Sequence, residues 1–156
     1  MNLSPNFKYD EFIQSDTAKR LGIPNEPPDS ALPMARALCE KLLEPIRAKW
    51  GPLRITSGYR SPALNIEIGG AATSDHCWDD LSAAADVQPI NAGMKEVFDW
   101  LRLESGLPFD QILLEHKDDV DRPRCIHIGY RENPRRMAGI TTTQSRGKVK
   151  EWLVVV

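Results

Sequence analysis

Two histidines and one aspartate, His76, Asp86 and His127, have the residue types of a metal site. A catalytic zinc usually takes three protein ligands from histidine and carboxylate side chains, and its fourth position holds water, whose pKa falls to about 7. Ile126 and Ile128 flank His127, so in a strand His127 would face one side of the sheet and the isoleucines the other. On spacing alone, a structural hydrogen bond between His76 and Asp86 is the simpler interpretation.

The elements that must position these residues are predicted from apolar periodicity and from helix-breaking residues. The apolar run 83–87, which contains Asp86, is typical of a buried strand, and segments 109–115 and 124–130 predict two antiparallel strands joined by a hairpin loop. The other expected elements are a short peripheral helix at 9–21, a core helix at 30–50 capped by Asp29 or Ser30, a strand at 53–57, a short helix at 61–68, a helix at 91–105 capped by Asn91, and an edge strand at 151–156.

Length and composition narrow the class of protein. The chain has 156 residues, the usual size of one domain, and we expect a single domain and a monomer. The formal net charge is -2 and no run of lysine or arginine occurs, which argues against a nucleic-acid partner. No apolar stretch approaches the roughly 20 residues that span a bilayer, and the N-terminus lacks the features of a signal peptide, so we expect a protein made in the cytoplasm that does not bind membranes. The spacing of the three cysteines indicates neither a disulfide framework nor a thiolate zinc site.

A set of short motifs then occurs in a specific order: Ser57-Gly58-Tyr59-Arg60-Ser61-Pro62, Asn65, Gly69-Gly70, Ser74-Asp75-His76, Ala84-Ala85-Asp86-Val87 and Ile126-His127-Ile128. In this order the motifs resemble the M15 family of zinc D-alanyl-D-alanine peptidases, most of all the branch found in bacteriophage lysins and bacterial cell-wall carboxypeptidases. The resemblance extends over about residues 9–135. It implies an α+β fold of the Hedgehog/DD-peptidase type, in which helices cover one side of a small antiparallel sheet.

The resemblance also implies the roles of particular side chains. His76, Asp86 and His127 would hold Zn²⁺, and Glu115, at the end of a strand beside the one that carries His127, would be the general base. Arg60 would meet the substrate near its scissile peptide or its C-terminal carboxylate, because a guanidinium binds a carboxylate through two parallel bonds and can stabilise an oxyanion.

Other polar residues near these motifs have secondary roles. Ser74 and Asp75 would bind substrate in the cleft or brace the loop that ends at the first histidine. Asp119 and Asp121 are reserve candidates for the base, although solvated loop charges are the simpler interpretation. His116 has no identifiable partner and is expected to be a solvent-facing loop residue.

Two departures from the family pattern bear on the site. Relatives usually have a shorter, glycine-containing segment between the first histidine and the aspartate, where this chain has CWDDLSAAA. Either this segment bulges with Trp78 at its tip, which we favour, or Asp79 or Asp80 replaces Asp86 as a ligand. Cys125 stands two residues before the second histidine, where some relatives have another histidine, and is expected to be a small buried residue.

The function that follows from the resemblance is zinc-dependent hydrolysis of peptide bonds in peptidoglycan stem peptides, by a D-Ala-D-Ala carboxypeptidase or an endolysin-type endopeptidase. Such a protein would act on the cell wall, after phage-mediated release or as part of a virion. The alternative is a non-catalytic, metal-containing module of the same fold that binds a cell-wall fragment or a protein. A dipeptidase for free D-alanyl-D-alanine is a further possibility among enzymes.

Overall fold

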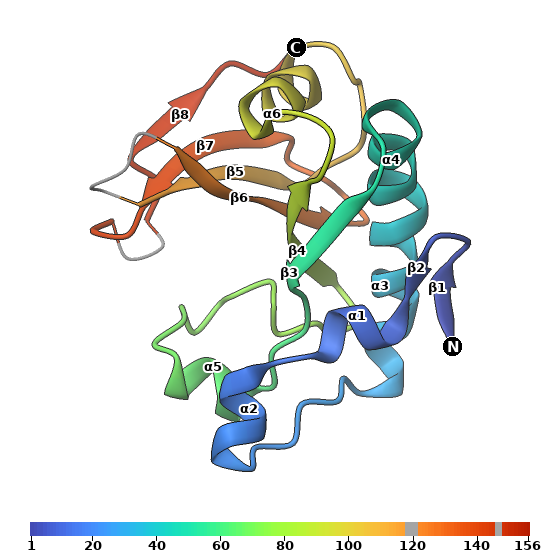
Figure 1. The fold of residues 1–156 in the computed structure, drawn as a ribbon, viewed down its shortest axis with the longest axis vertical. Coiled ribbons are helices and arrows are strands. Elements are labelled where there is room, and N and C mark those ends of the chain that lie inside the picture. Colours follow the sequence, from blue (N-terminus) through green and yellow to red (C-terminus); the bar gives the residue numbers. More distant parts are fainter. Residues whose placement is uncertain (118–121, 146–147) are drawn as a thin grey trace.

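Two sheets and a set of short helices make up the parts of the chain that the structure describes. The computed structural model describes residues 1–117, 122–145 and 148–156, and Figure 1 shows their arrangement. A six-stranded sheet has the order β3-β4-β6-β5-β7-β8, and a separate hairpin pairs β1 (Asn2–Ser4) with β2 (Phe7–Lys8). The strands of the larger sheet are β3 (Leu53–Ser57), β4 (Ser82–Pro89), β5 (Gln111–His116), β6 (Pro123–Arg131), β7 (Met137–Thr142) and β8 (Glu151–Leu153).

The helices lie mostly in the first half of the chain. They are α1 (Tyr9–Ile13), α2 (Asp16–Leu21), η1 (Asp29–Ala31), α3 (Leu32–Leu38), η2 (Cys39–Leu43), α4 (Glu44–Trp50), α5 (Pro62–Glu67) and α6 (Met94–Leu103). The segment from α3 to α4 is continuously helical, with a π-type turn at η2 in which the amide of Glu44 donates to the carbonyl of Cys39. Pro45 follows at once and has no amide hydrogen, which accounts for the local change of hydrogen-bond pattern.

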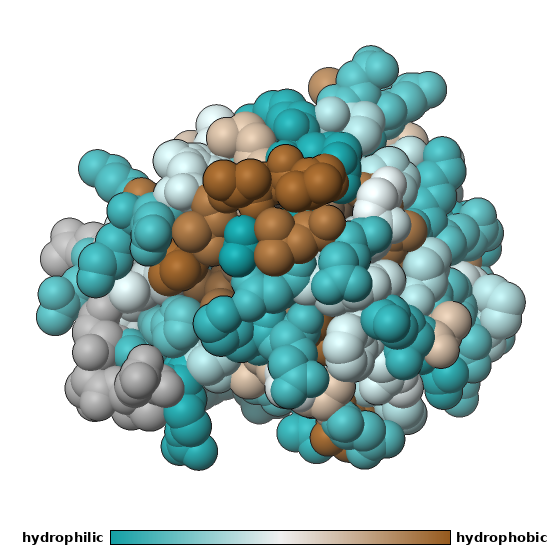
Figure 2. All heavy atoms as spheres, turned by 90° about the horizontal axis from the view of Figure 1, so that it is seen from above, coloured by the Kyte–Doolittle hydropathy of each residue, from teal (hydrophilic) through white to brown (hydrophobic). Residues whose placement is uncertain are grey.

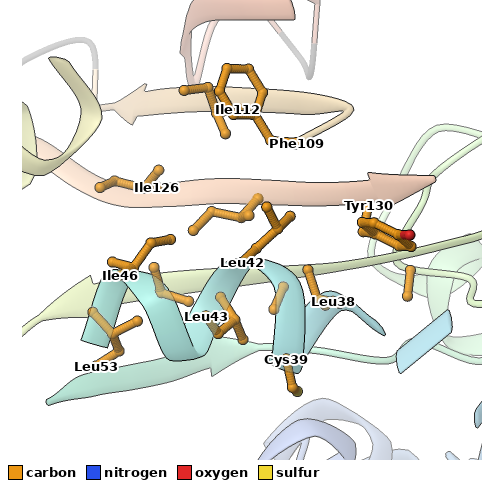
Figure 3. Close-up of a cluster of buried hydrophobic side chains, with 14 of the residues drawn as sticks. Leu38, Cys39, Leu42, Leu43, Ile46, Leu53, Phe109, Ile112, Ile126 and Tyr130 are labelled. Carbon is orange, nitrogen blue, oxygen red and sulfur yellow. The ribbon is translucent and has the colours of Figure 1, made fainter. Parts of the chain in front are cut away.

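One face of the large sheet packs against helices and forms the core. Ile112 of β5 and Ile126 of β6 are fully buried on this face, together with Leu38, Leu42 and Ile46 of the α3–α4 segment. Figure 3 shows these side chains between the helix and the strands. Helix α6 contacts β5 and β6 and adds Val97, Phe98 and Leu101 to the same cluster. The helices are thus held to this face by apolar burial.

The opposite face of the sheet carries the polar residues. Asp86 of β4 pairs directly with His127 of β6, and Glu115 of β5 pairs with Cys125 of β6. Because side chains alternate along a strand, burial of Ile126 and Ile128 in the core turns His127 to the other face. The predicted separation of the isoleucines from the histidine is therefore confirmed.

The predicted α+β class is confirmed, but several details are wrong. The larger sheet is mixed, because β5 pairs with β7 in parallel, and the sequence analysis missed β7. The helix expected at 9–21 is two helices, since Ser15 begins α2 as its N-cap. Asp29 and Ser30 do not cap the core helix, and the N-cap of α6 is Gly93 rather than Asn91.

The C-terminus lies beside α6 at one end of the molecule. The amide of Val156 donates to the carbonyl of Arg102, and β8 forms the predicted edge strand. Val154 and Val156 are exposed there, as is Leu103 in part, and Figure 2 shows apolar side chains gathered on the surface seen from this end. Among the described residues, no helix has the length and apolar composition needed to cross a bilayer.

Gly58 allows the close packing that places the loop after β3. A Cβ atom on Gly58 would lie 2.7 Å from both Cα and Cβ of Phe12, which is fully buried. We expect Gly58→Ala to lower the free energy of unfolding of the metal-free protein by about 2 to 3 kcal/mol, because the backbone of α1 must move. Urea unfolding followed by circular dichroism measures this loss.

Gly93→Ala is the matched control, since a Cβ atom there would come no closer than 3.5 Å to its neighbours. Its cost should not exceed about 1 kcal/mol, the usual penalty for alanine at an N-cap. Equal losses for the two variants would show that the contact between Gly58 and Phe12 is not tight.

Candidate active site

His76, Asp86 and His127 meet at one point on the polar face of the sheet. Asp86 Oδ1 lies 3.0 Å from His127 Nδ1 and 3.2 Å from His76 Nε2, and the two histidine nitrogens are 3.2 Å apart. All three side chains are buried. Strand pairing places Asp86 beside His127, and the loop between α5 and β4 brings His76 over them. The structure therefore brings together the three residues predicted as metal ligands.

The hydrogen bonds of His76 decide which of its atoms face the centre of this group. Its Nδ1 lies 2.7 Å from the carbonyl oxygen of Gly58. A carbonyl oxygen only accepts, so Nδ1 carries the hydrogen, and Nε2 of the neutral ring presents a lone pair. That lone pair faces a carboxylate oxygen of Asp86 and the ring nitrogen of His127. Electron-pair donors so close together repel one another unless a proton or a cation lies between them.

A tetrahedral metal ion fits this donor set. Metal–nitrogen and metal–oxygen bonds of about 2.0 to 2.1 Å place adjacent ligand atoms of a tetrahedron roughly 3.3 Å apart. The three separations here are 3.0 to 3.2 Å. One buried acidic oxygen and two imidazole nitrogens are also the ligand types that such ions prefer, so His76, Asp86 and His127 could hold a divalent ion with little movement.

The electrostatics of the three residues favour positive charge between their donor atoms. Burial alone lowers the pKa of His127, but the hydrogen bond and the negative charge of Asp86 outweigh it, so the pKa of His127 lies above its ordinary value. Burial alone raises the pKa of Asp86, but the two neighbouring histidines outweigh it and hold that pKa well below its usual range. Asp86 is therefore ionised and attracts positive charge.

The loop that carries His76 is fixed by hydrogen bonds on both sides. The amide of Arg60 donates to the carbonyl of His76, and the amide of His76 donates to Ser74 Oγ. Trp78 is buried and donates from its indole nitrogen to the carbonyl of Ala84, so the prediction that it lies at the tip of a bulge is wrong. The large side chain instead fixes the inserted segment against the sheet.

The alternative acidic ligands lie elsewhere. Asp79 Oδ1 accepts hydrogen bonds from the amides of Leu81 and Ser82, which forms a turn at the surface. Asp80 is exposed, and neither aspartate belongs to a group of possible metal ligands in the described part of the chain. The geometry therefore favours Asp86.

His76 and His127 line a cleft of about 550 Å³, and several other side chains predicted to have roles in the site also line it. Arg60, Ser74, Asp75 and Glu115 all border this cleft. Arg60 Nη1 donates to Asn65 Oδ1, and a Cβ atom on Gly70 would collide with that same oxygen, so the predicted motif residues Asn65 and Gly70 serve to place Arg60.

Glu115 lies next to the group of three. One of its carboxylate oxygens, one of Asp86 and the sulfur of Cys125 lie within 4.8 Å of one another. The thiol of Cys125 donates to Glu115 Oε2 at 3.2 Å, and burial, with the nearby carboxylates of Asp86 and Glu115, raises the pKa of that thiol. Glu115 is thus within reach of a water molecule in the cleft. The reserve candidates Asp119 and Asp121 lie outside the described residues.

The family model described as Peptidase M15 matches residues 5–120 of the chain. The chain belongs to the peptidase M15 family. The matched part of this M15 chain includes Arg60, His76, Asp86 and Glu115, whereas His127 lies beyond it, so the place of His127 in the site rests on the geometry. No curated protein shows significant similarity to the chain.

The M15 site also contains charged residues that the sequence analysis missed. Arg131 and Arg135 line the cleft, and both contact Asp110, which is fully buried. Alternation along the strand could have identified Arg131, because His127, Gly129 and Arg131 share one face of β6. His116 does not line the cleft. It is the last residue of β5 and partly buried, so the expectation of a solvent-facing loop residue is wrong.

Metal binding to this M15 chain should strengthen as the pH rises. The raised pKa of His127 stabilises the metal-free protein below about pH 6.5, the ordinary histidine pKa, and this contribution is lost as the pH rises through the raised pKa. A metal ion must displace that proton, so its apparent affinity should rise by up to about tenfold per pH unit through this window. We therefore expect the increase in melting temperature caused by added Zn²⁺ to grow between about pH 5.5 and 8.

Differential scanning fluorimetry with and without Zn²⁺ across this range measures the effect. His116→Gln is the matched control and should keep the wild-type profile, whereas His127→Gln should abolish it. The same zinc-induced shift at every pH would contradict a proton held at His127.

Proposed function

We propose that the chain is a zinc-dependent peptidase that hydrolyses peptide bonds in peptidoglycan stem peptides. The observation that carries this proposal is the meeting of His76 Nε2, Asp86 Oδ1 and His127 Nδ1 beside a cleft that His76, His127 and Glu115 line. Membership of the peptidase M15 family supports peptide hydrolysis. The choice of stem peptides is supported by the likeness of the ordered motifs to D-alanyl-D-alanine peptidases.

His76, Asp86 and His127 would hold the zinc ion. When bound, zinc would supply a Lewis acid for the scissile carbonyl and would lower the pKa of a water molecule. Glu115 would accept the proton of the attacking water and later donate it to the amine that leaves. Its Oε2 is held by the thiol of Cys125, which leaves the other oxygen free for that proton.

Arg60 would stabilise negative charge as it develops on the substrate. Its guanidinium lines the same cleft and is oriented by a hydrogen bond to Asn65. A charge that is already in position near the reacting carbonyl stabilises the transition state more than one that must first move. Ser74 braces the His76 loop by accepting the hydrogen bond of the His76 amide, and Asp75 borders the cleft beside it. Asp75 would then contact the substrate, and Ser74 would act chiefly by bracing this loop.

The place of action belongs to the same proposal. A peptidase of stem peptides acts on the cell wall, which this chain would reach after phage-mediated release or as a component of a virion. The bond that it would cut there is either an internal peptide bond or a C-terminal one.

Replacement of the proposed base tests the reaction. We expect Glu115→Gln to lower kcat for release of amines from purified peptidoglycan by about 10²- to 10⁴-fold while the protein still binds one equivalent of zinc, because the base acts on the proton and not on the metal. Glu96→Gln, on the exposed surface of α6, is the matched control and should keep full activity. A wild-type protein that binds zinc but releases no amine from any wall preparation or from D-alanyl-D-alanine would instead be a binding module.

Replacement of the acidic ligand tests the metal centre. We expect Asp86→Asn to weaken zinc binding by at least about 100-fold, since it removes the one negative charge among the three ligands. Asp79→Asn and Asp80→Asn should bind zinc like the wild type, because both residues lie at the surface. Competition with a chromogenic chelator measures each affinity, and a loss confined to the Asp79 or Asp80 variant would overturn this ligand set.

A further inference from the structure

A pair of arginines is fixed at the end of the cleft that lies away from Glu115. Along the cleft face of β6, Cys125 lies beside Glu115, followed by His127, then Gly129 and then Arg131. Arg131 is therefore four residues beyond the metal site on the same strand, about 13 Å at most along the strand axis. Arg135, which follows β6, lines the cleft at the same end.

Two carboxylates hold these arginines from behind. Arg131 Nη2 lies 2.9 Å from Asp75 Oδ1, and its Nε lies 3.4 Å from Asp110 Oδ2. Arg135 binds Asp110 through two nitrogens, Nε at 3.0 Å and Nη2 at 2.7 Å. Both guanidinium groups are thus oriented before any substrate arrives, which lowers the entropy lost when they bind one.

The exposed charge at this end of the cleft is positive. The side chains of Arg131 and Arg135 are 41% and 47% exposed, whereas those of Asp75 and Asp110 are only 11% and 0% exposed. The two arginines and two aspartates have no net formal charge, but the carboxylates are buried beneath the guanidinium groups. A ligand in the cleft would therefore contact the guanidinium groups first. Among the described residues, Nη1 of Arg131 makes no hydrogen bond and remains available to a ligand.

Gly129 keeps the floor open between the metal site and these arginines. A Cβ atom at this position would lie 3.8 Å from His127 Nε2 and 3.7 Å from Asp75 Oδ2, in the space that joins the two sites. A larger side chain would fill that space. Glycine thus leaves space on the cleft floor between His127 and Arg131, both of which line the cleft.

We propose that Arg131, oriented by Asp75 and Asp110, binds a carboxylate group of the peptide substrate within about four residues of the scissile bond. This inference rests on the proposed peptidase function and specifies its substrate class as anionic peptides. The carboxylate can be the C-terminus of the peptide or an acidic side chain. Arg60 then remains free to act at the scissile carbonyl, so the two arginines have separate tasks.

The experiment compares substrates that differ in one charge. Zinc-loaded full-length protein carrying Glu115→Gln, which prevents turnover, is titrated with two pairs of acetylated pentapeptides. One pair ends in D-alanyl-D-alanine as the free acid or as the amide, and the other pair is amidated and has an internal glutamate or glutamine. The acid-to-amide and glutamate-to-glutamine affinity ratios are then measured again with Arg131→Gln added.

We expect Arg131→Gln to reduce one of these ratios about tenfold, because one charge-assisted contact to a half-exposed guanidinium is lost. A reduced acid-to-amide ratio would show that Arg131 binds the C-terminal carboxylate. A reduced glutamate-to-glutamine ratio would show that it binds an acidic side chain. Arg124→Gln, an exposed arginine on the same strand outside the cleft, is the matched control and should change neither ratio. If Arg131→Gln also changes neither ratio, the proposal is overturned.

Two further measurements distinguish a failure of the carboxylate site from a failure of the proposed peptidase function and from misfolding of the variant. If Arg131→Gln folds poorly or loses zinc, Arg131→Lys is measured in its place. It keeps the positive charge beside Asp75 but loses the planar guanidinium, so its affinity ratio should be intermediate. Hydrolysis of the same peptides by the protein with Glu115 intact is measured in parallel. Charge-dependent binding without hydrolysis would refute the peptidase function and support the carboxylate site. Hydrolysis without charge dependence would support the peptidase function and refute the carboxylate site.

Discussion

The hydrogen bond from His76 Nδ1 to the carbonyl of Gly58 is the interaction on which the site depends. It fixes the ring so that Nε2 faces Asp86 and His127, which gives three buried polar side chains the arrangement of a group that could hold a metal ion. The position of that carbonyl depends in turn on the absence of a side chain at Gly58, where the chain passes directly against Phe12. The close contact between Gly58 and Phe12 thereby determines the orientation of the His76 ring in the site.

Strand register is the second constraint. The pairing of β4 with β6 places Asp86 opposite His127, and the pairing of β5 with β6 places Glu115 opposite Cys125. A slip of one residue would turn His127 into the core and Ile128 into the cleft, so apolar burial on one face enforces the polar arrangement on the other. The inserted segment before β4 is tolerated because Trp78 is buried and anchors to Ala84, which leaves the register of β4 unchanged.

Much of this arrangement could be predicted because it follows from local alternation and from short motifs. The flanking isoleucines fix the face of His127, and Asp86 lies within an apolar run that can only be a buried strand. Residues whose roles depend on distant partners could not be predicted. β7 is a parallel neighbour of β5, and no turn signal links the two. Trp78 is turned inward by contacts with Phe12 of α1 and with Tyr59, which follows β3. Arg131 alternates with His127 along β6, but its partner Asp110 precedes another strand, so only the fold shows that Arg131 is paired and borders the cleft.

Negative charge gathers where Asp86 and Glu115 meet, and it explains why a cysteine suits position 125. The carboxylates of Asp86 and Glu115 lie close together, and each is more stable when positive charge or a hydrogen-bond donor is near. For Asp86, the neighbouring histidines supply hydrogen bonds and positive charge that hold its pKa below the usual range. For Glu115 a thiol with a raised pKa is an effective partner, because it stays protonated, donates a hydrogen bond and adds no charge of its own. A cationic side chain at the same place would form an ion pair with Glu115, whereas the thiol contacts only Oε2, and the other oxygen has no hydrogen bond among the described residues, as the proposed role in proton transfer requires.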